Sequence, residues 1–420
     1  MRKNFVKNIL VLAGGTASAQ LINIICLPLL TRLYTPSEFG VFAIFNAINA
    51  IVAVFCTWKY ENAIIAVETE LRAKLSAILV IVLSGITATA LLILAVTTIT
   101  VFNIQWGDIY SLTIASYFAV IIGAWYQAYY FWNNRQLSYS CMSKARLLGA
   151  LTMVGFATSY GYFVGGVNGL LYGTVLGLCV NLYYLHRNGN ALINLKRLPS
   201  LKKLVVVAIN LKRFPKFLVV SSMLDRTSAQ MHLMLFGKFY DTAVSGALGL
   251  HNRIISLPTS IIGNAVGDVF KRQASESLRE TGQCRRLFFK AALSLFVIAS
   301  PVAIILMLFA PQIFVFVFGE QWQQAGEISQ ILSINFWIAF VVSPLSNLIY
   351  LEENQKYDFF LQVLLFGMLA SSMGYAVVYL DMVMAVWAFS ISYIVKYLIE
   401  FFICTKIALG HSNLNCTSNC

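Results

Sequence analysis

The sequence predicts an all-α polytopic membrane protein with twelve transmembrane helices. They are expected to form two six-helix bundles related by a pseudo-two-fold axis along the membrane normal. Three observations predict this fold class: the composition, a succession of apolar segments and a faint internal repeat. Of the 420 residues, 59% are hydrophobic and 11% are charged, whereas an ordinary soluble domain is about 25% charged. A soluble protein this apolar could not cover its surface, so we expect lipid around most of it.

A helix needs about 20 mostly apolar residues to cross a bilayer. Twelve segments of the chain fit this description: 6–31, 38–62, 74–101, 110–133, 145–164, 166–186, 214–237, 243–268, 288–318, 328–351, 357–379 and 383–408. The first segment, with its basic start and the small residues Ala17-Ser18-Ala19, also resembles a secretory signal, and cleavage is the alternative interpretation. Apolar residues resume from 21 to 30, so we interpret the whole segment as the first span.

The distribution of basic residues predicts the orientation. If the N-terminus is cytoplasmic, 24 of the 30 Lys and Arg lie in cytoplasmic segments or at the cytoplasmic ends of spans, four lie deeper inside spans, and only Arg32 and Lys238 lie outside. This bias follows the positive-inside rule and places both termini in the cytoplasm. The net charge of +13 therefore needs no nucleic-acid partner to explain it.

The longest connection divides the chain into halves of six spans. We expect an N-terminal bundle over residues 1–190, a basic cytoplasmic linker over 191–213, a C-terminal bundle over 214–410 and a cytoplasmic tail over 411–420. The basic residues of the linker suit a surface segment, including an interfacial amphipathic one.

A weak repeat relates the two halves. "TRLYTPSEFGVF" begins at Thr31, and "GKFYDTAVSGAL" follows 206 residues later. Tyr34 aligns with Tyr240 and Gly40 with Gly246, and both segments join the first and second spans of their half on the outer face. Because each half has an even number of spans, the halves enter the membrane in the same orientation. Parallel repeats of this kind build transporters whose substrate site lies between the halves.

Longer stretches resemble a known family. "GGTASAQLINIICLPLLTRLYTPSEFGVFAIF" is similar to the opening of bacterial polysaccharide-unit flippases, the Wzx-type O-antigen transporters, and "GALGLHNRIISLPTSIIGNAVGDVFKRQASE" resembles their eighth-helix pattern. "FGEQWQQAG" matches the turn before their tenth helix. The residues that carry the resemblance, with an expected structural role, include Gln20, Pro28, Arg32, Tyr34, Pro36, Gly40, Gly246 and Pro258.

The resemblance extends over essentially the whole chain, within the multidrug/oligosaccharidyl-lipid/polysaccharide exporter superfamily. It implies two bundles around a central cavity and the flipping of undecaprenyl-diphosphate-linked oligosaccharide units for surface polysaccharide, O-antigen or capsule, by alternating access. It also implies the cytoplasmic (inner) membrane of a bacterium as the location, with a lipid-linked oligosaccharide and membrane lipids as partners. Binding of a polysaccharide polymerase and assembly proteins is left open.

Charges inside spans are expensive, so they usually face a cavity or a partner. Asp225 and Arg226 fall in the middle of the seventh span, and Arg253 falls about ten residues into the eighth. Neighbours on a helix point roughly 100° apart, so we expect Asp225 and Arg226 neither to face one site nor to pair well. One of them is expected to face the cavity beside Arg253, whose planar donors suit a diphosphate. The alternative is a structural ion pair of Asp225 with Arg253 or Arg226.

Other charged and aromatic residues have simpler interpretations. Lys59 and Glu61 close the second span and are a candidate inner gate, although a lysine that reaches the interface is the simpler alternative. Lys396 and Glu400 are spaced to pair with each other. The aromatic stretch from residue 125 to 139 fits an interfacial belt, with inward-facing Trp125, Tyr126 and Tyr130 that stack on sugars as the alternative.

No enzyme chemistry is visible, because the chain has no Walker loop and no Ser/His/Asp arrangement or paired carboxylates on an outer loop. The eight cysteines and four histidines show no metal-ligand spacing, so we expect no metal and no cofactor. Two other functions compete with flipping. One is export of drugs or cations by a member of the same superfamily, and the other is a membrane glycosyltransferase or glycan polymerase.

Overall fold

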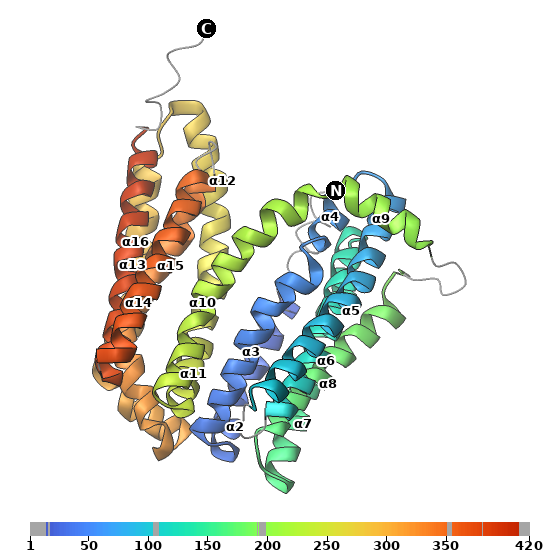
Figure 1. The fold of residues 1–420 in the computed structure, drawn as a ribbon. Helices are drawn as coiled ribbons and strands as arrows, with labels where there is room; N and C mark the ends of the chain where they lie inside the picture. The colour runs from blue at the N-terminus through green and yellow to red at the C-terminus, as the bar shows by residue number, and fades with distance from the viewer. Residues whose placement is uncertain are drawn as a thin grey trace. The chain divides into compact units, whose positions relative to one another are not determined.

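The protein is represented by a computed structural model, which describes residues 14–15, 17–103, 109–190, 192, 199–350, 355–379 and 381–410. Every regular element in these ranges is a helix (Figure 1). The chain divides into two compact units, Met1–Gln230 and Met231–Cys420. Residues 6–13 of the first predicted span, most of residues 191–198 of the linker and the tail 411–420 lie outside the described ranges.

The helices follow the predicted spans closely. Those before the division are α2 (Leu27–Leu33), α3 (Pro36–Thr57), α4 (Glu61–Ala66), α5 (Glu70–Val101), α6 (Ile109–Arg135), α7 (Tyr139–Phe163), α8 (Asn168–Asn188) and α9 (Leu201–Asn210). Helix α10 (Val220–Phe239) contains the division, and it is followed by α11 (Thr242–Pro258), α12 (Asn264–Thr281), α13 (Arg285–Phe318), α14 (Gln323–Leu345), α15 (Gln355–Tyr379) and α16 (Met382–Ala408).

Seven helical segments of the described chain are long and apolar enough to cross a membrane. They are Pro36–Thr57, Glu70–Val101, Ile109–Arg135, Arg285–Phe318, Glu320–Ile349, Tyr357–Ala376 and Met382–Ala408. A shorter apolar helix, Ala17–Leu33, occupies the described part of the first predicted span. Helices α7, α8, α10 and α11 coincide with the remaining predicted spans but are shorter or more polar, as expected of helices that carry charged side chains such as Arg146 and Arg226.

The two units share one scheme of helix packing. In the first unit α5 packs against α6, α7 against α8, α6 against α8 and α3 against α6. In the second unit α13 packs against α14, α15 against α16, α14 against α16 and α11 against α14. Helices α3, α5, α6, α7 and α8 therefore correspond in order to α11, α13, α14, α15 and α16, as the internal repeat predicts.

The corner after the first predicted span is closed by capping and by a buried tyrosine. Thr35 and Glu38 form a capping box, in which the Glu38 amide donates to the Thr35 hydroxyl and the Thr35 amide donates to the Glu38 carboxylate. Pro36 starts α3 with a preset φ. Tyr34 is 1% exposed, and its hydroxyl donates to the Ala157 carbonyl on α7 over 2.6 Å. Burial, reinforced by the Glu38 carboxylate, raises the pKa of Tyr34 to about 12, so the hydroxyl stays a donor at neutral pH.

Two glycines make room for this tyrosine. A Cβ on Gly161 of α7 would lie 2.9 Å from Cε2 and Cζ of Tyr34, and a Cβ on Gly169 of α8 would collide with the Tyr34 hydroxyl. The Tyr34 ring therefore packs directly on the backbone of α7 and α8, at two positions where only glycine, which has no Cβ, leaves enough space.

The corner after the seventh predicted span repeats the first corner in outline. Asp241, at the position of Thr35, is the N-cap of α11 and accepts from the Ala243 amide over 3.0 Å. Tyr240 donates to the Ala376 carbonyl on α15 over 2.9 Å. Gly40 and Gly246 are both buried, each in the second turn of the helix that follows its corner. The predicted equivalence of the two corners is confirmed.

The remaining residues of the family pattern are placed as follows. Gln20 lies in the first described helix, and Pro28 lies in the first turn of α2. Arg32 is exposed in the last turn of α2. Pro258 ends α11, and a π-helical turn over Thr259–Gly263 follows it.

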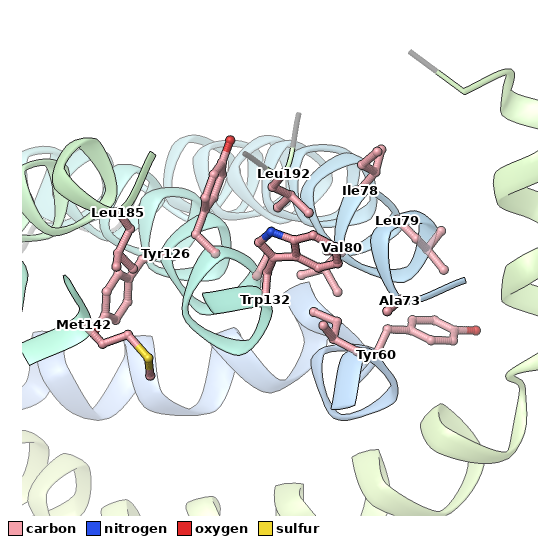
Figure 2. Packing of buried hydrophobic residues seen from close by; sticks show 14 of the residues in the cluster. Tyr60, Ala73, Ile78, Leu79, Val80, Tyr126, Trp132, Met142, Leu185 and Leu192 are labelled. Carbon is pink, nitrogen blue, oxygen red and sulfur yellow. The ribbon is translucent and has the colours of Figure 1, made fainter. Parts of the chain in front are cut away.

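A cluster of buried side chains joins α4, α5, α6, α7 and α8 in the first unit (Figure 2). Trp132 of α6 is 2% exposed, and its indole donates to the Asn190 carbonyl over 3.2 Å. Leu204 of α9 and Tyr60, between α3 and α4, belong to the same cluster. This core therefore fixes the short helix α9 to the end of the unit where the second predicted span stops.

Candidate substrate-binding residues

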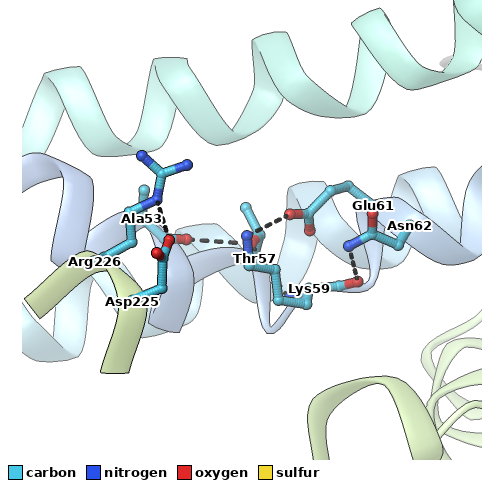
Figure 3. Close-up of polar contacts among 7 residues, drawn as sticks. All are labelled: Ala53, Thr57, Lys59, Glu61, Asn62, Asp225 and Arg226. Atoms are coloured by element: carbon cyan, nitrogen blue, oxygen red, sulfur yellow. Dashed lines mark hydrogen bonds and ion pairs between the residues drawn. The ribbon is translucent and has the colours of Figure 1, made fainter. Parts of the chain in front are cut away.

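Asp225 and Arg226 lie side by side on α10 and contact each other. Arg226 Nε is 3.9 Å from Asp225 Oδ2, and both side chains are about half exposed, at 52% and 56% (Figure 3). A separation of 3.9 Å is too long for a hydrogen bond. The contact is therefore weak, as expected of neighbours that point about 100° apart on a helix. An exposed pair of this length contributes little to stability, so both charges stay accessible.

Arg253 lies on α11 and is partly buried. The Ser256 hydroxyl donates to the Arg253 carbonyl over 2.8 Å. Pro258 lacks an amide hydrogen, and the helix gives way there to the π-helical turn Thr259–Gly263. Such turns often occur at functional sites. Arg253 therefore sits just over one turn before a break in regular helix geometry, on the helix that the resemblance singled out.

A buried polar network holds the same helix within the second unit. His251 of α11 shares a hydrogen bond of 3.0 Å with Ser329 of α14, and Asn252 contacts His232 of α10 at 3.4 Å. The His232 ring lies 4.5 Å from the ring of Phe389 on α16. Sequence reasoning assigned no role to these histidines, because their partners lie on other helices and no local residue spacing indicates such contacts.

Lys59 occupies a break between α3 and α4. Trp58 and Lys59 both have left-handed backbones, with φ of 49° and 59°, which is uncommon for residues other than glycine. Lys59 Nζ lies 3.8 Å from the carboxylate of Glu61, and the two side chains are 21% and 8% exposed (Figure 3). Lys59 is therefore held near a buried carboxylate at the end of the span; its role as a gate stays a prediction.

Arg135 holds the chain just after this break. From the sequence it was expected only to be one of the 24 basic residues on the cytoplasmic side. Its Nη1 donates to the carbonyls of Ile64 and Val67 over 3.0 and 2.6 Å, and its Nη2 donates to the Glu68 carbonyl over 2.8 Å. These carbonyls belong to the end of α4 and the residues after it, where helical partners run out. A basic residue at the end of one span thus caps another helix about 70 positions earlier.

Arg146 forms a second arrangement that sequence reasoning missed. Its Nε donates to the Tyr126 hydroxyl over 3.3 Å, and its guanidinium lies 4.6 Å from the ring centre of Tyr130. Tyr126 is buried and Tyr130 partly so, whereas Trp125 is 36% exposed and donates to the Ile81 carbonyl. Tyr126 and Tyr130, which were expected either to lie in an interfacial belt or to face inward, thus contact an arginine of α7.

The predicted pair on the last helix is confirmed. Lys396 Nζ lies 2.6 Å from Glu400 Oε2, and the two side chains are only 12% and 6% exposed. The grouping of Arg226, Arg253, Asp225 and Lys59 around one substrate cavity is not tested by these contacts and stays a prediction.

Several solved structures have a fold similar to that of this chain. The lipid II flippase MurJ in an inward closed conformation matches with a TM-score of 0.72 and 12% identity, over 95% of this chain and 90% of that one. An inward-facing MATE multidrug resistance transporter of the MOP superfamily matches with a TM-score of 0.64 and 14% identity, over 94% and 96%. A MOP superfamily transporter from Pyrococcus furiosus, reported with a binding pocket of reverse polarity, matches with a TM-score of 0.58 and 16% identity, over 96% of this chain and 94% of that one.

These similarities confirm the predicted fold class, a polytopic fold of twelve helices in two lobes, and with the apolar helices they identify a multi-pass membrane protein. No curated protein sequence matches the chain. The family model described as "Polysaccharide biosynthesis protein" matches residues 29–327, well over half of the sequence. The chain belongs to this polysaccharide biosynthesis protein family.

Proposed function

We propose that this protein flips undecaprenyl-diphosphate-linked oligosaccharide units across the cytoplasmic membrane for surface polysaccharide, O-antigen or capsule, by alternating access. The single observation that carries the proposal is the match to the polysaccharide biosynthesis family over residues 29–327. The fold supports it, because a solved protein of similar fold is described as a lipid II flippase.

The chemistry of the substrate sets what the residues must do. The diphosphate and sugars must leave water and cross the hydrocarbon, whereas the polyprenyl tail can stay in lipid throughout. Arginine suits the diphosphate, because its planar guanidinium donates two parallel hydrogen bonds to phosphate oxygens. We assign this contact to Arg253, on the irregular helix α11, with Arg226 as a second candidate whose partner Asp225 releases it when phosphate binds.

Lys59 and Arg146 complete the set of cationic residues. Lys59, held 3.8 Å from Glu61 at the end of the second span, is the proposed inner gate. Arg146 and the partly buried Tyr130 ring combine a phosphate donor with a flat aromatic face of the kind that favours sugar stacking. The proposal therefore adds Arg146 to the residues expected from the sequence alone.

The proposed setting is the inner membrane of a bacterium with both termini in the cytoplasm. It rests on the concentration of Lys and Arg in loops of one side, 24 against two. Flipped units in the outer leaflet would be substrates of a polysaccharide polymerase and assembly proteins, which are the expected partners.

A drug or cation exporter is the second candidate, because several solved proteins of similar fold are described as multidrug resistance or MATE transporters. An exporter of cations is expected to place acidic groups where its substrate binds. With Arg146 included, the candidate residues here are four basic groups and one acidic group, which favours an anionic substrate.

The test uses a strain that lacks the gene and is complemented with variants of equal membrane abundance. Arg253→Ala should abolish surface polysaccharide and trap lipid-linked units in the cytoplasmic leaflet, measured by their accessibility to a reagent that cannot cross the membrane. Arg279→Ala removes an exposed arginine from the last turn of α12 and should leave export normal.

Normal surface polysaccharide with Arg253→Ala would refute the role of Arg253. Intact polysaccharide in the deletion strain itself, combined with new sensitivity to drugs, would instead support the exporter.

A further inference from the structure

Helix α9 (Leu201–Asn210) presents two distinct apolar faces. One face packs on the first unit: Leu204 is 4% exposed within the buried cluster, and the Tyr60 hydroxyl donates to the Ala208 carbonyl over 3.1 Å. Tyr60 lies between α3 and α4, where the second predicted span ends. Helix α9 is therefore held at the level at which the membrane meets the cytoplasm.

A second face of α9 is apolar and uncovered. Leu201, Val205 and Ile209 recur every fourth residue and form one stripe along the helix, with exposures of 71%, 56% and 59%. The stripe is centred about 100° around the axis from Leu204, so it points away from the core that holds the helix. Leaving such a stripe in water is unfavourable.

The charges on α9 and just after it are all of one sign. Lys202 and Lys203 on α9 are exposed, as are Lys212 and Arg213 just after it. The sequence contains no acidic residue between Asp108 and Asp225. An apolar stripe bordered by exposed basic residues is the pattern of a helix that lies in an anionic membrane surface.

We propose that α9 binds the anionic phospholipids of the cytoplasmic leaflet. Leu201, Val205 and Ile209 insert among the acyl chains near the headgroups, and the lysines contact the phosphates. Lys202, beside the stripe, reaches the headgroups by extending its alkyl stem along the apolar surface. The long connection between the two predicted bundles is thereby held on the membrane at a fixed point, whichever substrate the protein carries.

The experiment uses the full-length protein with an environment-sensitive fluorescent amino acid at Val205, reconstituted in phosphatidylcholine vesicles with and without phosphatidylglycerol. Nitroxide groups on the lipid chains serve as quenchers. The matched control carries the probe at Asn210, which is exposed about 140° around the helix from Val205. A probe at Ile209 repeats the measurement in case the Val205 variant does not fold.

We expect blue-shifted emission and strong lipid quenching at Val205 and Ile209, and little of either at Asn210. Phosphatidylglycerol should increase the quenching at Val205, and Lys202→Gln with Lys203→Gln should abolish that increase. Water-like emission at both stripe positions would overturn the proposal. Blue-shifted emission without lipid quenching would also overturn it, because the stripe would then be covered by protein, such as a second copy. Quenching that ignores phosphatidylglycerol would refute the anionic specificity.

Discussion

The two corners, after the first and the seventh predicted spans, form the same hydrogen bond but differ in how tightly they are packed. Each places a tyrosine hydroxyl on the carbonyl of an alanine in the fifth span of its half, Tyr34 on Ala157 and Tyr240 on Ala376. Tyr34 is 1% exposed and wedged against Gly161 and Gly169, whereas Tyr240 is only partly buried. Repeated halves can thus keep one hydrogen bond while the packing around it diverges.

The helices that follow the two corners differ at their far ends. Helix α3 covers Pro36–Thr57 and stops at two left-handed residues, after which Arg135 caps the short α4. At an offset of 206, the corresponding stretch Thr242–Gly263 is α11 with its π-helical turn, and the chain continues into α12. The same position is therefore a sharp break in one unit and a softer irregularity in the other, on the helix that carries Arg253.

The largest expected effect on stability comes from a substitution that disrupts the packing around Tyr34. Gly169→Ala should destabilise the protein by about 1–3 kcal/mol, because the new methyl group collides with a buried hydroxyl that cannot move freely. Thermal unfolding in detergent measures the change. Gly374→Ala is the matched control in the other unit: nothing lies within 4 Å of a Cβ there, so it should be neutral or slightly stabilising.

A double variant sharpens this prediction. Tyr34→Phe removes the colliding oxygen, so Gly169→Ala should cost less in that background than in the natural protein. Gly161→Ala collides with the ring carbons themselves, at 2.9 Å, and should not be rescued in the same way. Equal costs of Gly169→Ala in both backgrounds would contradict the packing described for the corner.

A smaller effect separates the two tyrosines. Tyr34→Phe should cost about 1 kcal/mol and Tyr240→Phe about 0.5 kcal/mol, because both lose one hydrogen bond but only Tyr34 leaves a fully buried position unsatisfied. Melting temperatures of the two variants, measured side by side, test the order. A larger loss for Tyr240→Phe would show that the second corner is the more tightly held.

Patterns that depend on neighbours in the sequence were predictable. Thr35, Pro36 and Glu38 encode a capped helix start locally, and the Lys396–Glu400 pair follows from a spacing of four. Apolar length alone located the spans, because the hydrocarbon core has a fixed thickness.

Contacts that join distant helices were not predictable. Arg146 meets Tyr126 and Tyr130 only once α6 and α7 pack, and its sequence context merely marks it as a cytoplasmic charge. The His251–Ser329 contact likewise depends on tertiary packing.

The central claim is tested most directly with purified protein reconstituted into liposomes that contain an undecaprenyl-diphosphate-linked oligosaccharide. The fraction of sugar units exposed outside is followed over time with a glycan-modifying enzyme that cannot enter the vesicles. The account predicts that all units become accessible with the natural protein and only the outer half with Arg253→Ala. Equal accessibility in liposomes with the natural protein and in liposomes without protein would contradict it.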